Sequence, residues 1–132
     1  MVRATVPKCI LIVDGNQYIR KIIRSFLESE AGFKVCGEAV DGYDAIEKAE
    51  QLKPDLIILD VSLPGMNGIR VASKLKEMHP RTPIVLFTFY HEAFHNLGTP
   101  AGFDAVVPKD GHISLLINSV QGLLNEGIPH LV

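Results

Sequence analysis

Four polar residues of complementary chemistry each stand at the end of a short apolar run. They are two carboxylates, a hydroxyl and an ammonium: Asp14, Asp60, Thr88 and Lys109. The carboxyl ends of parallel strands meet at one edge of a sheet, which is where α/β proteins of this kind place their sites. The four residues therefore predict a metal-and-phosphate site with Asp60 at its centre. The plainer alternative is that they are polar residues that end strands at the surface.

The residue types suit magnesium and a phosphoryl group. Mg²⁺ prefers oxygen ligands and keeps several waters, so Asp14, Asp60 and the backbone carbonyl of Ser62 could hold it. A carboxylate beside a metal can also act as a nucleophile. Lys109 would supply a positive charge and Thr88 a hydroxyl for phosphoryl oxygens. Phosphoryl transfer needs mainly positioning and charge neutralisation, which this set could provide.

The elements that must position these residues alternate between strand and helix. Strands are predicted at 8–13, 34–39, 55–60, 83–88 and 104–108. Strict alternation implies a doubly wound α/β domain of three layers, in which helices cover both faces of a parallel five-stranded sheet. The common strand order for such a sheet is 2-1-3-4-5. In that order Asp14 and Asp60 face each other across the crevice between neighbouring strands.

The helices are predicted from apolar spacing and capping residues. The first follows Asn16, a plausible N-cap, and the second and third cover about 43–52 and 67–79. The fourth, about 92–97, is expected to be short because Gly98, Thr99 and Pro100 follow it. The last opens after Asp110 and Gly111.

Composition indicates one globular domain, predicted to span 1–132 with a core of about 8–126. The chain has 132 residues, 47% of them hydrophobic and 21% charged, with a formal net charge of -2. Such a balance gives no basic footprint for nucleic acid. No apolar run is long enough to span a bilayer, and the first eight residues do not resemble a signal peptide. We therefore expect a cytoplasmic protein that binds neither nucleic acid directly nor a membrane.

Cys9 and Cys36 both fall in predicted strands. They could lie side by side on neighbouring strands and form a disulfide. We favour the alternative of two small buried thiols, because a reducing cytosol disfavours disulfides.

Several stretches of the chain resemble the receiver domains of response regulators in two-component signalling. They are ILIVD at 10–14, EAVDGYDA at 38–45, PDLIILD at 54–60 and LPGMNG at 63–68, followed by Thr88 and by Lys109. The resemblance covers roughly residues 8–125, with the motifs in the family's order. It implies a flavodoxin-like (CheY-like) fold and a signalling switch rather than an enzyme.

The resemblance also implies roles for the candidate residues. Asp60 would be the phosphoacceptor, Asp14 part of the Mg²⁺ pocket, and Thr88 and Lys109 the pair that senses phosphorylation. A sensor histidine kinase or a phosphotransfer protein would donate the phosphoryl group, and a downstream output protein or domain would read the changed surface. Apart from the resemblance, the extra apolar residues of the last helix could form a homodimer or partner surface, although packing of that helix over the sheet explains them equally well. Asp110 after Lys109 is more typical of transcriptional regulators than of stand-alone receivers.

Three positions depart from the family's pattern. Gly15 replaces a second acid that often contacts the metal, which puts Mg²⁺ affinity in question unless Asn16 or Asp14 compensates. Phe89 replaces a small residue and could crowd the approach to Asp60, and Val106 replaces an aromatic residue. These departures predict impaired phosphorylation. They also leave open a second hypothesis, a pseudo-receiver that binds its partner without phosphate.

A competing motif is His91-Glu92-x-x-His95, which matches the zinc-binding HExxH pattern. On a helix its two histidines could bind Zn²⁺ with Glu92 as general base, as in a metalloprotease. The expected third ligand position is Ala101, however, and His112 is an unsupported substitute. We interpret the motif as a coincidence.

Overall fold

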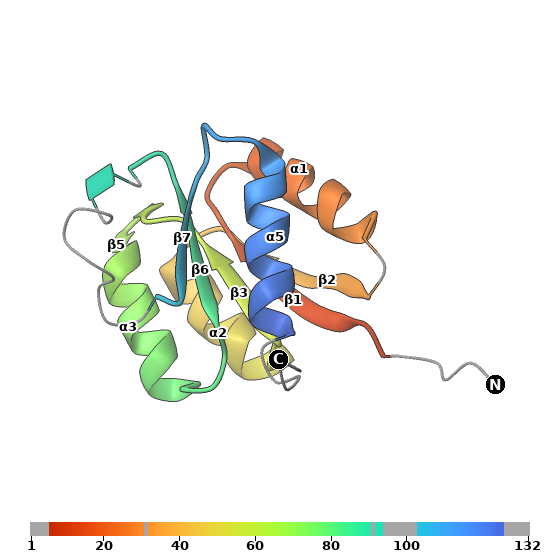
Figure 1. The fold of residues 1–132 in the computed structure, drawn as a ribbon. Helices are drawn as coiled ribbons and strands as arrows, with labels where there is room; N and C mark the ends of the chain where they lie inside the picture. Colours follow the sequence, from red (N-terminus) through yellow and green to blue (C-terminus); the bar gives the residue numbers. More distant parts are fainter. Residues whose placement is uncertain (1–5, 31, 91, 94–102, 126–132) are drawn as a thin grey trace, which may run out of the picture.

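The computed structural model describes residues 6–30, 32–90, 92–93 and 103–125, and it shows a parallel sheet in the order β2-β1-β3-β6-β7 (Figure 1). This order confirms the predicted 2-1-3-4-5 arrangement, because β6 and β7 are the fourth and fifth strands of this sheet along the chain. The strand bounds are close to those expected from the apolar runs. They are β1 Lys8–Val13, β2 Phe33–Ala39, β3 Leu56–Leu59, β6 Ile84–Thr88 and β7 Ala105–Pro108.

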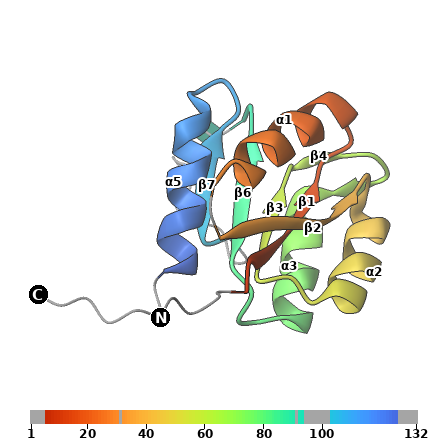
Figure 2. The ribbon, with the colours of Figure 1, turned by 90° about the vertical axis from the view of Figure 1, so that its right-hand side faces the viewer.

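Helices cover both faces of the sheet (Figure 2). The helices α1 Gln17–Glu28 and α5 Ile113–Leu124 pack on one face, and α2 Gly42–Leu52 and α3 Gly68–Met78 pack on the other. The central strand β3 is buried along its whole length, as expected for a strand covered on both sides. Each fully buried Leu or Ile contributes about 1.5–3 kcal/mol to folding. Two apolar cores, one on each face, therefore hold the sheet in place.

The ends of the helices follow from side-chain caps. The Asn16 Oδ1 accepts the backbone N–H groups of Tyr18 and Ile19, which confirms the predicted N-cap of α1. Asp41 and Asn67 cap α2 and α3 in the same way, so α3 begins one residue later than predicted. The predicted fourth helix at 92–97 lies mostly outside the described residues.

A small antiparallel ladder after β3 was not predicted. It pairs β4 Ser62–Leu63 with β5 Met66–Asn67. Pro64 and Gly65 make the turn between them, and Gly65 has a φ of 76°, which favours glycine. The Pro-Gly pair was a readable turn signal. This turn lies beside Gly15 of the β1–α1 loop, because a Cβ added at Gly15 would lie 3.2 Å from Pro64 Cδ.

A β-bulge in β2 decides which side chains face which helices. Val35 belongs to the core under α1 and α5, whereas Ala39 belongs to the core under α2 and α3. Simple alternation would put both on one face, since they are four residues apart. Ile10 pairs with Val35 but Leu11 pairs with Gly37, so Cys36 is the extra residue of the bulge.

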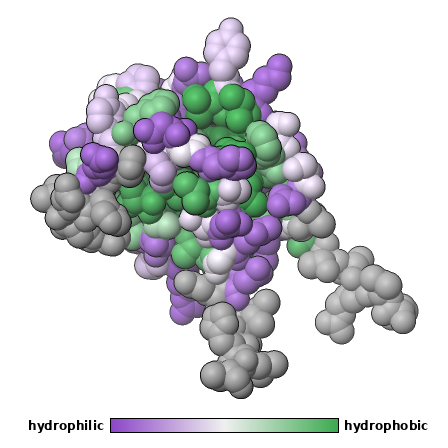
Figure 3. Space-filling view, turned by 45° about the horizontal axis from the view of Figure 1, so that its top comes forward, coloured by the Kyte–Doolittle hydropathy of each residue, from purple (hydrophilic) through white to green (hydrophobic). Residues whose placement is uncertain are grey.

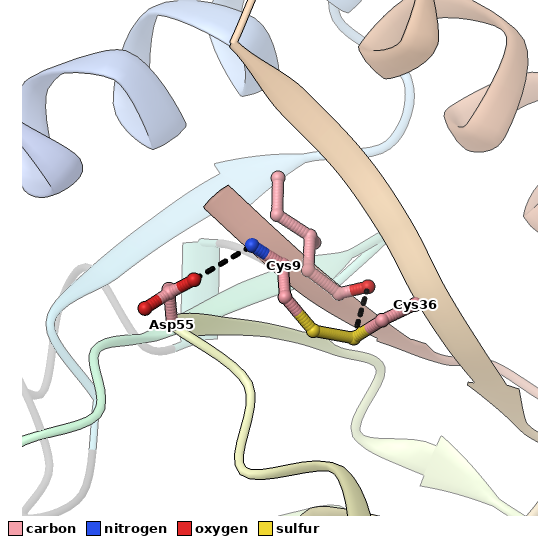
Figure 4. The surroundings of a disulfide bond; sticks show 4 residues. Cys9, Cys36 and Asp55 are labelled. Atoms are coloured by element: carbon pink, nitrogen blue, oxygen red, sulfur yellow. Dashed lines mark hydrogen bonds between the residues drawn. A yellow bond between two sulfur atoms is a disulfide. The ribbon is translucent and has the colours of Figure 1, made fainter. Parts of the chain in front are cut away.

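The two cysteines form a disulfide between β1 and β2, which corrects our preference for free thiols (Figure 4). The bulge leaves the Cα atoms of Cys9 and Cys36 5.4 Å apart, inside the range that a disulfide spans. The expectation of reduced thiols came from the assumed compartment. It ignored the local register, which sequence alone did not reveal.

None of the helices in the described ranges is long and apolar enough to cross a bilayer.

Glu38 ties α1 to the edge strand β2. Its carboxylate accepts Arg20 Nε and Arg24 Nε, each at 2.8 Å. Burial alone would raise the pKa of Glu38, but the hydrogen bonds and charges of Arg24 and Arg20 together outweigh it and lower the pKa. The ionised form is therefore favoured in the folded state.

Replacing Glu38 by glutamine should lower the free energy of unfolding by about 1 kcal/mol at pH 7. A lowered pKa stabilises the fold above the unfolded value of about 4.3, and that contribution is lost as the pH falls through the folded pKa. The difference between the wild type and Glu38→Gln should thus shrink below about pH 4.3. Urea unfolding at several pH values measures it, with exposed Glu47→Gln as the control. A difference that is constant with pH would contradict the ion-pair account.

Candidate functional site

Three of the four predicted residues meet at the carboxyl ends of β1, β3 and β7. Lys109 Nζ lies 2.6 Å from Asp14 Oδ2 and 3.0 Å from Asp60 Oδ2, so one ammonium bridges both carboxylates. The three side chains are buried, with exposed fractions of 5% for Lys109, 4% for Asp14 and 10% for Asp60. The surface alternative is therefore wrong for these three residues.

Strand pairing fixes the two aspartates side by side. Val13 pairs with Leu59 in the parallel β1–β3 ladder, and Asp60 N–H donates to the Val13 carbonyl at 3.0 Å. Asp14 N–H donates in turn to the carbonyl of Ala39 in β2. The last backbone hydrogen bonds of the central strands therefore place both carboxylates at one edge.

Each carboxylate has two kinds of partner. Asp14 Oδ1 accepts the N–H of Asn16 at 2.8 Å, and Asp60 Oδ1 accepts the N–H of Ser62 at 3.3 Å. Their other oxygens accept from Lys109. Two carboxylates this close would otherwise repel each other, and the ammonium leaves the group with one net negative charge. Lys109 itself is held by its backbone N–H, which donates to the Thr88 carbonyl at 2.9 Å.

Thr88 lies next to this group, but its hydroxyl is engaged elsewhere. Its side chain is fully buried, and Oγ1 accepts the N–H of Tyr90 at 3.0 Å. The structure thus places Thr88 at the predicted strand end and does not direct its hydroxyl to either aspartate.

A hollow of about 580 Å³ opens over the carboxylates. Its lining includes residues that the sequence analysis did not select, notably Ile19, Pro64 and Tyr90. The Pro-Gly pair at 64–65 could have indicated a turn at this edge of the sheet, whereas no local sequence pattern indicates that Ile19 or Tyr90 lines the hollow. The surface at this end of the sheet mixes apolar and hydrophilic groups (Figure 3).

The three departures have distinct structural settings. A Cβ at Gly15 would lie 3.2 Å from Pro64 Cδ, so a larger residue needs a small shift of that ring. Phe89 lines the hollow with 58% of its surface exposed, and its ring centroid lies 5.5 Å from Lys109 Nζ. Val106 packs at the edge of the apolar core. Asn16 Oδ1 accepts two backbone N–H groups as a helix cap, so of the two residues considered as compensation for Gly15, Asn16 has its oxygen engaged.

The donor set fits a magnesium ion in kind. Two carboxylates face one hollow, and Ser62, whose carbonyl is the third candidate ligand, also lines it. Such oxygens, completed by water, are what Mg²⁺ takes. Within the described ranges no group of three His, Cys, Asp or Glu side chains could hold a metal ion on its own.

The HExxH motif contributes nothing to this site. His91 and His95 lie outside the described residues. His112, named as a substitute third ligand, caps α5 instead, where its Nδ1 accepts the N–H of Ser114 at 3.1 Å.

Comparisons with known proteins agree with this fold. The family model of the response regulator receiver domain matches residues 10–121. The response regulator protein VraR of Staphylococcus saprophyticus is 32% identical over 122 residues, which are 90% of this chain and 57% of that protein. The protein-glutamate methylesterase/protein-glutamine glutaminase of Halalkalibacterium halodurans is 34% identical over 122 residues, 90% of this chain and 35% of that protein.

A solved structure has a similar fold. It is the response regulator protein TrrA from Thermotoga maritima in complex with Mg²⁺–BeF, 29% identical with a TM-score of 0.79, and the match covers 88% of this chain and 98% of that one. This chain spans about a third to just over half of the two curated relatives. The family match and these relatives, taken with the fold, show that the chain belongs to the response-regulator receiver domain family.

Proposed function

We propose that Asp60 accepts a phosphoryl group from the phosphohistidine of a sensor histidine kinase or phosphotransfer protein, and that it does so slowly. The observation that carries this proposal is the position of Asp60, which faces the hollow beside Asp14 and Lys109. The phosphorylated domain then presents a changed surface around β6 and β7 to an output protein or domain.

The transfer uses the donor's phosphohistidine together with the side chains of Asp60 and Lys109. A carboxylate oxygen of Asp60 forms a bond to phosphorus while the bond between phosphorus and the donor's imidazole nitrogen breaks, and the imidazole keeps the electron pair. The buried ammonium of Lys109 neutralises charge on the phosphoryl oxygens, as in other phosphoryl-transfer sites.

Asp14, Asp60 and the Ser62 carbonyl would hold Mg²⁺, which neutralises the negative charge of the phosphoryl oxygens when it is bound. Gly15 offers no third carboxylate, and Asn16 Oδ1 is occupied as a cap. We therefore propose that this domain binds Mg²⁺ weakly, which is one reason for slow phosphorylation.

The hydroxyl of Thr88 is the proposed switch element. It now accepts the N–H of Tyr90, so a move toward phosphoryl oxygens would release the backbone that follows β6. A local exchange of hydrogen bonds can shift a two-state equilibrium of a few kcal/mol and thereby change a surface.

A protein donor finds an apolar surface beside the hollow. Tyr18, Ile22 and Phe26 lie on α1 at intervals of four residues and are 69%, 48% and 45% exposed. A second cavity, lined by Ile19, Ile22 and Lys109 among others, adjoins the first because both share Ile19 and Lys109. This continuity supports docking of the donor against α1.

We further propose that the chain acts as one receiver domain over 1–132, in the cytoplasm, as part of transcriptional control. The similarity to the response regulator protein VraR, of which the match covers 57%, supports a link to an output domain.

Acetyl phosphate with Mg²⁺ should add one phosphoryl group to the full chain, read by intact mass, and Asp60→Asn should abolish it. Asp41→Asn, which keeps an N-cap at α2, is the matched control and should label like the wild type. Absence of labelling in the wild type, together with failure to bind beryllofluoride, would favour the phosphate-independent pseudo-receiver.

Gly15→Asp should tighten Mg²⁺ binding, because it adds a carboxylate at the mouth of the hollow. We expect about a tenfold gain in affinity, which corresponds to about 1.4 kcal/mol. Isothermal titration calorimetry measures it. Gly15→Ala is the matched control, since its Cβ meets Pro64 equally closely without adding charge. Equal affinities of the two variants would show that the missing acid does not limit metal binding.

Phe89→Ala should speed labelling by acetyl phosphate a few-fold, because it removes a ring from the lining of the hollow. Tyr43→Ala is the control, since Tyr43 is similarly exposed at 67% and does not line the hollow. Time courses by intact mass give the rates. An unchanged or slower rate in Phe89→Ala would show that the ring does not crowd Asp60.

A further inference from the structure

The Cys9–Cys36 disulfide joins β1 to the edge strand β2 (Figure 4). Cys9 lies level with Asp55, which precedes β3, and therefore at the end of the sheet away from Asp60. We propose that it is a reversible modification site, which a dithiol reductant opens and an oxidised thiol closes while the fold is kept. The proposal does not depend on phosphorylation of Asp60.

The proposal requires that a thiolate can reach the bond from solvent. Both cysteines are only half-buried. The edge strand β2 has β1 as its one neighbour in the sheet, and Lys34, the residue paired with Cys9, is exposed. Thiol–disulfide exchange requires a thiolate to reach one of the sulfurs, so access decides whether a disulfide is labile or locked.

The backbone around Cys9 does not need the bond. Cys9 N–H donates to Asp55 Oδ2 at 2.7 Å, and Asp55 N–H donates to the Cys9 carbonyl at 2.7 Å. These hydrogen bonds fix β1 to the start of β3 in either redox state.

In the reduced protein the thiol of Cys36 would also have a hydrogen-bond acceptor. Cys36 Sγ lies 3.6 Å from the Ile10 carbonyl oxygen, and a thiol there would donate to that oxygen. On both sides of the bulge the β1–β2 ladder continues, from Lys8 with Phe33 to Val13 with Ala39. Opening the disulfide therefore leaves no polar group of Cys36 unpaired and leaves the ladder to hold the edge strand.

The closed form restrains one part of the domain in particular. The two cysteines are 27 positions apart, and the loop between them contains Asp14 and the whole of α1. A disulfide stabilises a fold mainly by reducing the conformational freedom of the unfolded chain between its two cysteines. Reduction should thus loosen α1 and β2 more than β3 or β6.

The exchange balances with a dithiol as co-reactant. A thiolate of the reductant attacks one protein sulfur and forms a mixed disulfide, and the second protein sulfur leaves as a thiolate. The second thiol of the reductant then attacks the mixed disulfide and releases the remaining protein sulfur. The protein gains two electrons and two protons, and the reductant becomes a disulfide.

The test applies dithiothreitol to the native 132-residue chain, followed by N-ethylmaleimide and intact mass. We expect no adduct before reduction, two adducts after it, and none once glutathione disulfide has closed the bond again. Circular dichroism should stay that of the folded protein throughout. Adducts before reduction, no adducts without denaturant, or loss of the fold on reduction would each overturn the proposal.

The location of the effect is tested by hydrogen exchange and melting. Amides of α1 and β2 should exchange faster after reduction, whereas those of β3 and β6 should not. The melting temperature should fall by on the order of 10 °C. The matched control is the double variant Cys9→Ser with Cys36→Ser, which should melt like the reduced wild type and ignore dithiothreitol. A uniform rise in exchange, or a double variant that still responds to dithiothreitol, would contradict the proposal.

Discussion

The bridge from Lys109 to Asp14 and Asp60 is the interaction on which the rest of the site depends. Two carboxylates at the ends of adjacent strands are a consequence of the β1–β3 ladder, and alone they would repel each other in a buried setting. The ammonium makes their proximity tolerable, and it can be there because β7 ends beside β6. The order of the strands therefore brings the two carboxylates together and also brings the ammonium that offsets their repulsion.

The edge strand satisfies a second constraint, because its residues must serve both faces of the sheet. Val35 packs under α1 and α5, yet Ala39 packs under α2 and α3. One extra residue at Cys36 reconciles these requirements. The same irregularity leaves Glu38 free to pair with Arg20 and Arg24 of α1. A regular strand would point Val35 and Ala39 to the same face of the sheet, whereas the bulge lets each pack into the core on its own face.

Local signals predicted the elements, and long-range register decided what they missed. Apolar runs and caps such as Asn16 located the strands and helices, and strand order followed from alternation. The strand order also predicted that Asp14 and Asp60 face each other, whereas it places Lys109 only at the same edge of the sheet. The disulfide and the bulge did not, because both depend on how β2 aligns with β1 rather than on the composition of either. Thr88 was correctly predicted at the end of its strand. The hydrogen bond from Tyr90 N–H to its hydroxyl depends on the path of the chain after β6, which no short motif specifies.

The absence of an acid at Gly15 also affects the net charge of the site. The bridged group carries one net negative charge before phosphorylation. A phosphoryl group on Asp60 replaces a carboxylate charge of one with a charge of about two. With Lys109 retained, the site then holds about two net negative charges, which one divalent cation would cancel. A further acid at position 15 would leave that phosphorylated site negative again. On our proposal, a glycine there weakens the attraction for Mg²⁺ in the unmodified domain, and one ion would then neutralise the modified domain. The glycine that we propose slows phosphorylation is thus, on electrostatic grounds, compatible with a stable phosphorylated state.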